Sequence, residues 1–135
     1  MKGKKLNFKT YVLKTPYKDY KRVIVAPFIT RYAVNNRLCI VLEDVKTGET
    51  WGTLTVNIDA DFSMKSDLLA FVDTDENDYE DNDMSYVLKF IEDNNLGRPT
   101  NAYGYSGFCV YPEYAFDISK LNDEKAYEEY CKGEF

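Results

Sequence analysis

An acidic stretch between Asp73 and Asp83 has the residue spacing closest to that of a metal site. Asp, Asn and Tyr side chains alternate along it with the spacing of an EF-hand loop, in which such oxygens converge on calcium. The sixth position, where that loop needs glycine for its sharp turn, is Asp78. The twelfth position, where it needs a bidentate glutamate, is Met84. The sequence therefore predicts no metal site here.

The same acidic side chains allow two other interpretations. Closely spaced carboxylates repel one another and leave little to bury, which predicts an exposed loop that aids solubility. Alternatively, their negative charge and the neighbouring tyrosines imitate a phosphate backbone and occupy a partner's nucleic-acid channel. Under this second interpretation the candidate binding residues are Asp73, Asp75, Glu76, Asp78, Tyr79, Glu80, Asp81, Asp83, Tyr86, Tyr103 and Tyr105.

The sequence Gly104-Tyr105-Ser106-Gly107 resembles the start of a nucleophile elbow, but the final glycine of that motif is absent. The chain also has no histidine to act as the base for Ser106 or Cys109. The three cysteines are far apart and lack a CxxC spacing, which predicts free thiols and no zinc site. We expect Cys39 and Cys109 to be small apolar core residues. The sequence thus predicts a protein that is not an enzyme and holds no cofactor.

Charge is divided unevenly along the chain, whose formal net charge is −6. Residues 1–58 carry +7, residues 59–95 carry −10 and residues 96–135 carry −3. The basic N-terminal part interleaves lysines with aromatic residues, a pattern found in nucleic-acid interfaces and also in ordinary lysine-rich edge strands. Because an acidic molecule repels nucleic acid at long range, we do not expect direct nucleic-acid binding.

The elements that position these residues are organised around a predicted β-hairpin. Its apolar strands, 38–42 and 51–58, flank a turn in which Gly48 is placed to take a positive φ. The outgoing strand is apolar on both faces, which predicts a central position covered by a helix or a second sheet. Alternation in the return strand places one apolar face toward the core. The residues expected to be mostly buried are Trp51, Leu54, Val56, Ile40 and Leu88.

Three further strands are predicted before the acidic stretch. Residues 6–13 form a lysine-rich edge strand. Residues 20–34 form either one long edge strand with a bulge at Pro27 or two strands that meet there. Asn35-Asn36 makes the tight turn into the hairpin, and residues 68–72 form a short strand.

The second half contributes two predicted helices. The first, 84–95, begins at a cap on Asn82 or Asp83 and ends at Gly97. The second, 122–131, is short and polar, with Asn122 as its cap and with Ala126, Tyr127 and Tyr130 as its packed side. Between them, residues 98–107 have the composition of a loop, and short strands lie on either side of Pro112.

These elements predict a single α+β domain over residues 1–135. Its antiparallel sheet has about four to six strands, with one main helix packed on a face and a short C-terminal helix. No run of eighteen apolar residues and no apolar leader segment occurs, so we expect a cytoplasmic protein that does not insert into a membrane.

Three sequence blocks resemble an uncharacterised domain-of-unknown-function family, the DUF-4313 type, from plasmids, conjugative elements and phages of gut bacteria. The blocks are Trp51-Gly52-Thr53-Leu54-Thr55-Val56-Asn57, Ala70-Phe71-Val72-Asp73-Thr74 and Ser106-Gly107-Phe108-Cys109-x-Tyr111-Pro112-x-Tyr114-x-Phe116. The resemblance implies a mobile-element setting and supplies no catalytic residues.

In that setting we expect a non-enzymatic protein that inhibits a host nucleic-acid-directed defence protein, of the anti-CRISPR or anti-restriction type. Its partner would be a host defence nuclease or another nucleic-acid-binding protein. The alternative is an accessory protein of a mobile element that binds another protein or a small molecule without inhibiting it. The partner's identity and the oligomeric state stay open.

Overall fold

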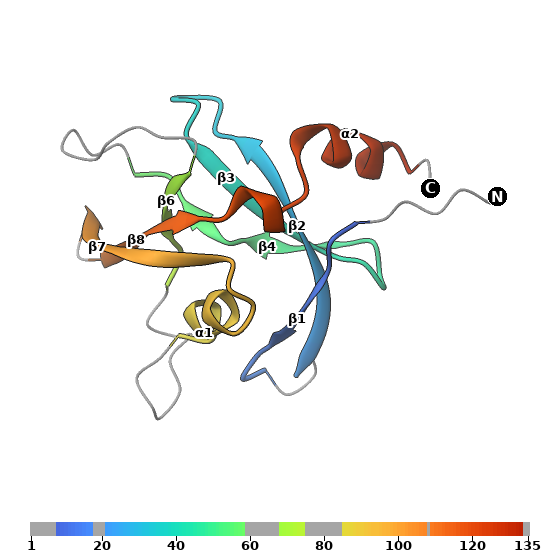
Figure 1. Ribbon diagram of the computed structural model, residues 1–135, viewed down its shortest axis with the longest axis horizontal. Helices are drawn as coiled ribbons and strands as arrows, with labels where there is room; N and C mark the ends of the chain where they lie inside the picture. Colours follow the sequence, from blue (N-terminus) through green and yellow to red (C-terminus); the bar gives the residue numbers. More distant parts are fainter. Residues whose placement is uncertain (1–7, 18–20, 59–67, 75–84, 108, 134–135) are drawn as a thin grey trace.

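The computed structural model describes residues 8–17, 21–58, 68–74, 85–107 and 109–133. Over these ranges the chain folds into two antiparallel four-stranded sheets with two α-helices (Figure 1). The α+β class predicted from the sequence is therefore confirmed. The predicted strands are, however, divided between two sheets.

The first sheet has the order β1-β2-β3-β4. Its strands are β1 (Tyr11–Lys14), β2 (Arg22–Arg31), β3 (Leu38–Asp44) and β4 (Thr50–Thr53). As predicted, β1 lies at an edge and β3 is internal. The turns on either side of β3 contain the expected left-handed residues, with φ of 60° at Asn36 and 78° at Gly48.

The second sheet has the order β5-β6-β8-β7. Its strands are β5 (Thr55–Val56), β6 (Leu69–Val72), β7 (Gly97–Ser106) and β8 (Cys109–Phe116). The β6 strand was predicted. The prediction of a loop over 98–107 was wrong, because β7 occupies that segment and pairs with β8, which runs without interruption through Pro112.

The two sheets are joined at Leu54, where the chain passes from β4 to β5. The Leu54 N–H donates to the Ile40 carbonyl at 2.8 Å, and the Leu54 carbonyl accepts from the Asp73 N–H at 3.0 Å. The N–H of Leu54 therefore bonds to β3 of the first sheet, whereas its carbonyl bonds to the residue that follows β6 of the second sheet. The predicted single return strand, 51–58, was wrong for this reason.

Burial follows from this change of sheet. Leu54 and Ile40 are fully buried, and Trp51, Val56 and Leu88 are partly buried against the apolar clusters, in line with the prediction that all five are mostly buried. Trp51 lies on the edge strand β4, and Val56 packs with a second small apolar cluster, formed by Ile58 and Phe71.

Helix α1 (Tyr86–Asp93) covers the inner faces of the sheets and lies between β1 and β7 (Figure 1). It begins after Ser85, whose buried side-chain oxygen accepts from the Val87 N–H at 3.1 Å. The proposed caps Asn82 and Asp83 lie outside the described residues. The helix ends at Asp93, and two residues later Asn95 adopts a left-handed φ of 53°, after which the Leu96 N–H donates to the Ile91 carbonyl at 3.0 Å.

Two glycines of the second sheet are required by close packing. A Cβ on Gly97, which was predicted to end α1, would lie 2.8 Å from the Ala115 carbonyl oxygen. A Cβ on Gly104 would lie 2.8 Å from a ring carbon of Phe71. Both glycines therefore allow neighbouring groups to approach β7.

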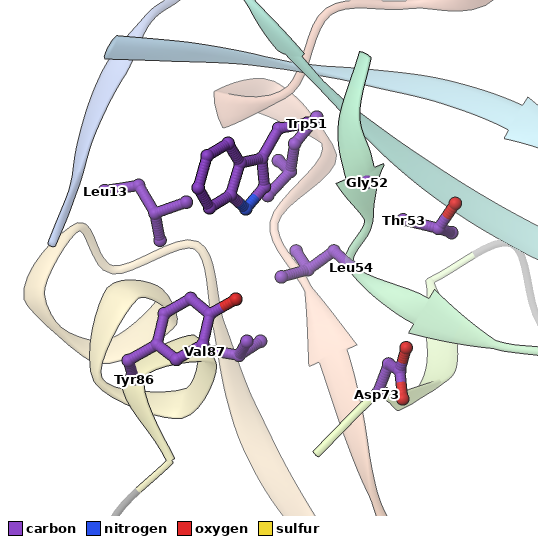
Figure 2. Close-up of a pocket in the computed structure, with 9 residues that line it drawn as sticks. Leu13, Trp51, Gly52, Thr53, Leu54, Asp73, Tyr86 and Val87 are labelled. Carbon is purple, nitrogen blue, oxygen red and sulfur yellow. The ribbon is translucent and has the colours of Figure 1, made fainter. Parts of the chain in front are cut away.

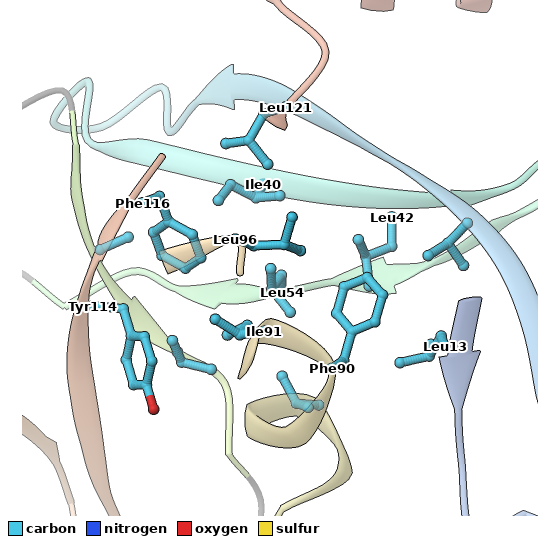
Figure 3. Close-up of a cluster of buried hydrophobic side chains, with 14 of the residues drawn as sticks. Leu13, Ile40, Leu42, Leu54, Phe90, Ile91, Leu96, Tyr114, Phe116 and Leu121 are labelled. Carbon is cyan, nitrogen blue, oxygen red and sulfur yellow. The ribbon is translucent and has the colours of Figure 1, made fainter. Parts of the chain in front are cut away.

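The main core lies between the two sheets and α1, as Figure 3 shows. It contains one side chain from β1, several from β3 and α1, and the aromatic end of β8. The buried residues labelled in the figure are Leu13, Ile40, Leu42, Leu54, Phe90, Ile91, Leu96, Tyr114, Phe116 and Leu121.

Helix α2 (Glu124–Lys132) packs on the outer face of the first sheet. The centroid of the Phe28 ring lies 4.9 Å from that of Tyr127 and 5.0 Å from that of Tyr130. These contacts confirm the predicted packed side of the helix at Tyr127 and Tyr130. The helix is capped by Asp123, not by Asn122 as predicted. Asn122 instead forms a parallel bridge with Phe28 in β2.

A buried carboxylate connects α2 to β3. Glu43 accepts hydrogen bonds from the Thr50 hydroxyl at 2.9 Å and from the Tyr127 hydroxyl at 2.9 Å. Burial, followed by the hydrogen bond to Glu43, raises the pKa of Tyr127 above its usual value. The neutral phenol is thus favoured in the folded state.

This raised pKa predicts that stability falls as the pH rises above about 10, where the unfolded tyrosine ionises first. The stabilisation is fully present below that pH and is lost as the pH rises toward the folded pKa. In Tyr127→Phe, the fall in unfolding free energy between about pH 9 and about pH 11 should be smaller than in the parent. Urea denaturation at each pH measures the unfolding free energy. An equal fall in both proteins would contradict the raised pKa of Tyr127.

Candidate functional site

The candidate binding residues predicted from the sequence fall into two groups. Asp73, Tyr86, Tyr103 and Tyr105 lie in the described part of the chain. The others, for which the structure gives no placement, are Asp75, Glu76, Asp78, Tyr79, Glu80, Asp81 and Asp83.

Asp73 and Tyr86 line one pocket of about 230 Å³, which Figure 2 shows. The pocket lies where β1, β4 and the start of α1 meet. The other residues that line it are Leu13, Leu42, Trp51, Gly52, Thr53, Leu54 and Val87. The structure therefore places two of the predicted site residues in the lining of one pocket.

Backbone structure fixes the polar side of this pocket. Asp73 directly follows β6, and its N–H donates to the Leu54 carbonyl. Tyr86 is the first residue of α1, directly after the buried cap Ser85. Its ring makes an edge-to-face contact with Tyr17, with 5.7 Å between the ring centroids. Tyr86 is thus held within a helix, and the backbone of Asp73 is held by its hydrogen bond to Leu54.

The pocket combines apolar, aromatic and anionic surfaces. Trp51 and Tyr86 lie on two sides of it, and the Tyr86 hydroxyl is directed toward the space between Trp51 and Leu54 (Figure 2). Asp73 is exposed to solvent. The Asp73 carboxylate lies apart from the two rings, beyond Leu54 (Figure 2). The faces of aromatic rings carry partial negative charge, so the space between Trp51 and Tyr86 favours an apolar or cationic group.

Tyr103 and Tyr105 belong to another surface. They lie on β7, at the edge of the second sheet, and neither lines the pocket. Tyr105 is 65% exposed and pairs across the hairpin with Val110, which is also exposed. Tyr103 and Tyr105 therefore lie outside the pocket that Asp73 and Tyr86 line, and most of the acidic stretch lies outside the described residues.

The residues considered for catalysis lie apart from the pocket. Ser106 and Cys109 face one another across the β7–β8 turn. Cys109 is exposed, which corrects its predicted burial, whereas Cys39 is buried as predicted. All three cysteines are free thiols. In the described ranges, no three His, Cys, Asp or Glu side chains are grouped so as to hold a metal ion.

Trp51 is the pocket residue that the sequence did not predict as functional. Its apolar character within a predicted strand indicated core, and its position on an edge strand depends on the change of sheet at Leu54.

Among the helices of the described ranges, none is long and apolar enough to cross a membrane.

Comparisons with known proteins give one match. Neither a curated protein sequence nor a solved structure matches this chain. A family model described as "Domain of unknown function (DUF4313)" matches residues 28–134. The match contains the central hairpin and all three sequence blocks that resembled the family, and it extends to α2. The chain therefore belongs to the DUF4313 family.

Proposed function

We propose that the chain is a non-enzymatic binding protein of a phage or other mobile element. It inhibits a nucleic-acid-directed host defence protein, of the anti-CRISPR or anti-restriction type, by occupying a basic surface that normally binds nucleic acid. The observation that supports this proposal is the position of Asp73. This exposed carboxylate, the first of the acidic stretch, lines a pocket with Trp51 and Tyr86.

Charge supports the choice of partner. Residues 59–95 carry −10, and most of that charge follows Asp73 directly in the sequence. A nucleic-acid channel presents Lys and Arg side chains to phosphates, and carboxylates satisfy the same side chains. Aromatic residues next to those charges add contact area at small cost in side-chain entropy.

The exposed patch of Tyr103, Tyr105 and Val110 favours a second candidate function. Exposed aromatic residues at the edge of a sheet are typical of a protein interface and need no charged partner. The alternative is therefore an accessory protein that binds another protein through β7 without inhibiting it. A variant that neutralises the acidic stretch separates the two functions.

Replacing Asp75, Glu76, Asp78 and Glu80 together by Asn or Gln keeps the length and polarity of the stretch and removes four charges. We expect inhibition to fall at least tenfold, which corresponds to a loss of about 1.4 kcal/mol in the free energy of binding to the partner. Most of the loss should appear in the association rate, because the charges steer the encounter. The assay is the plaquing efficiency of a phage that the host's CRISPR or restriction system targets, in cells that express the chain.

The matched control removes four exposed carboxylates elsewhere, in Glu49, Glu92, Glu124 and Glu128. It has the same net charge as the first variant and should inhibit like the parent. Equal inhibition by the first variant and the parent would remove the acidic stretch from the mechanism and favour the β7 patch. If the parent restores plaquing against neither type of defence system, the proposed inhibition is wrong.

A further inference from the structure

We propose that two copies of the chain pair through the open edge of β7 and form a symmetric dimer. The end of β7 that forms this edge carries Tyr103 and Tyr105, and it lies away from α1 (Figure 1). Three features support the dimer: the edge is unprotected, its backbone groups point outward, and its sequence is complementary to itself. The dimer does not depend on the proposed inhibition.

The second half of β7 is an edge without the usual protection. Within the described ranges, β7 has a neighbouring strand on one side only. Pro99 and a shift in register before Tyr103 disrupt the first half, whereas residues 103–106 pair with β8 one by one. Charges, prolines and bulges normally prevent an edge strand from pairing with another chain. Residues 103–106 contain no charge and no proline, so this segment is open to a further strand.

Hydrogen bonding in the second sheet fixes which backbone groups of this segment point outward. The Phe116 N–H donates to the carbonyl directly before β6 at 2.8 Å, so the backbone groups of Phe116 point toward β6. Because successive residues of a strand alternate in direction, those of Pro112 and Val110 also point toward β6. Tyr103 and Tyr105 lie directly opposite these two residues in β7. Their N–H and C=O groups therefore point away from β8, to the open edge.

The segment is complementary to a second copy of itself. A two-fold axis through Gly104, perpendicular to the sheet, places Tyr103 of each copy opposite Tyr105 of the other. Both residues point their backbone groups outward, so each pair exchanges its N–H and C=O groups. An axis through Tyr103 or Tyr105 would leave only one such pair. The register centred on Gly104 therefore uses every outward backbone group of the segment.

Side chains favour the same register. Tyr103 and Tyr105 are 49% and 65% exposed, and they share a face of the sheet with Val110, which is 47% exposed. The two-fold axis brings the tyrosines of both copies together on that face, where aromatic cross-strand pairs are stabilising. Gly104 faces the opposite side, toward Phe71, and has no side chain to meet its counterpart at the axis.

Charge distinguishes a second copy from a basic partner. Each chain carries a net charge of −6, so two copies repel one another at long range. Pairing through residues 103–106 brings no charged side chain of that segment into the contact. Because salt screens the long-range repulsion, the dimer should become tighter as the salt concentration rises. Binding to a basic surface would become weaker under the same change.

Sedimentation equilibrium of the full chain, from micromolar to millimolar concentration and at low and high salt, measures the dissociation constant of the dimer. We expect this constant to fall as salt rises. Tyr105→Lys places a charge on the open edge and should raise it at least tenfold. The matched control is Val34→Lys, which adds the same charge at a residue that is 90% exposed and lies outside β7. It should dimerise like the parent.

Engineered cysteines test the register. One chain carries Tyr103→Cys and the other Tyr105→Cys, both with Cys109→Ser and Cys131→Ser to remove the exposed native thiols. Oxidation of the mixture should link the two chains, because opposite Cα atoms of a hydrogen-bonded pair lie about 5.5 Å apart, within the range of a disulfide. Each variant alone should cross-link at least tenfold less. Mass spectrometry of the linked peptides identifies the pair.

Several outcomes would overturn the proposal. A chain that stays monomeric at every concentration and salt has no such dimer, and a dimer unchanged in Tyr105→Lys does not form through β7. Urea denaturation shows whether that variant is folded, and the cysteine test decides if it is not. Efficient cross-linking of either cysteine variant with itself contradicts the register centred on Gly104. A monomer whose binding to another protein is lost in Tyr105→Lys would assign the edge to that protein.

Discussion

Replacing Leu54 by alanine is expected to lower the free energy of unfolding by about 2–5 kcal/mol. Leu54 is 1% exposed and belongs to the main core. Its truncation removes buried apolar surface and leaves a cavity that the surrounding strands fill only in part. Because the backbone of Leu54 bonds to both sheets, the residue cannot shift toward the cavity without breaking hydrogen bonds to Ile40 or Asp73.

The matched control is Val34→Ala, which also truncates an apolar side chain but at a position that is 90% exposed. It should change the unfolding free energy by less than about 0.5 kcal/mol. Urea denaturation of the parent and both variants gives the comparison. A loss below about 1 kcal/mol for Leu54→Ala would contradict the central position of this residue between the sheets.

Local signals in the sequence were sufficient for the fold class and for the turns around β3. Asn36 and Gly48 adopt positive φ where the hairpin pattern requires it, and the apolar run 38–42 is internal to its sheet. These features depend on the conformational preferences of single residues and on alternation over a few positions. Such signals need no knowledge of distant parts of the chain.

The change of sheet at Leu54 had no such signal. Leu54 continues the alternation of a single strand, and the interruption comes from the Asp73 N–H, which bonds to it across a long sequence separation. The prediction of a loop at β7 failed for a related reason. Its content of Gly, Asn, Pro and Ser indicated a loop, whereas Gly104 admits the ring of Phe71, and Gly97, which was predicted to end α1, admits the backbone of β8.

The candidate site was predicted in part. Asp73 and Tyr86 were selected for their charge and aromatic character, and the structure places both in one pocket. Trp51 was assigned to the core and does pack against it, but its place in the pocket depends on the edge position of β4, which an apolar residue in a strand does not indicate. Tyr103 and Tyr105 were grouped with the acidic residues by composition alone, and the position of β7 separates them from the pocket.

A buried amide explains how β2 remains one continuous strand through Pro27. The sequence left open either one long edge strand with a bulge at Pro27 or two strands that meet there. The structure shows a single strand between β1 and β3 whose register with β3 is unbroken at Pro27, so the edge position and the bulge were wrong. The Pro27 carbonyl accepts hydrogen bonds from the backbone N–H and the side-chain amide of Asn122, both at 2.9 Å. Because the nitrogen and carbonyl of one residue point to the same side of a strand, the missing proline N–H lies on this side, away from β3.

Asn122 also holds the segment before β1. Its side-chain oxygen accepts from the Lys9 N–H at 2.8 Å, and its side-chain amide donates to the Lys9 carbonyl at 3.0 Å. The side chain thus makes three hydrogen bonds at a position that is 5% exposed. It pairs with the Lys9 backbone as a neighbouring strand would.

Asn122→Ala should therefore lower the unfolding free energy by about 2–4 kcal/mol, because it removes three hydrogen bonds, of which the one to the Pro27 carbonyl is buried. Asn57→Ala is the matched control, since it removes an exposed asparagine bonded only to Asn35 among the contacts described. The control should cost less than about 1 kcal/mol.

Asn122→Asp distinguishes the amide's two roles. It keeps the acceptor for the Lys9 N–H but loses both donated bonds and places a carboxylate beside the Lys9 and Pro27 carbonyls. We expect it to destabilise the fold at least as much as alanine does, because an anion facing carbonyl oxygens is repelled and desolvated. If Asn122→Asp is as stable as the parent, the donated bonds contribute nothing, and β2 is held at Pro27 by its pairing with β3 and by the backbone of Asn122.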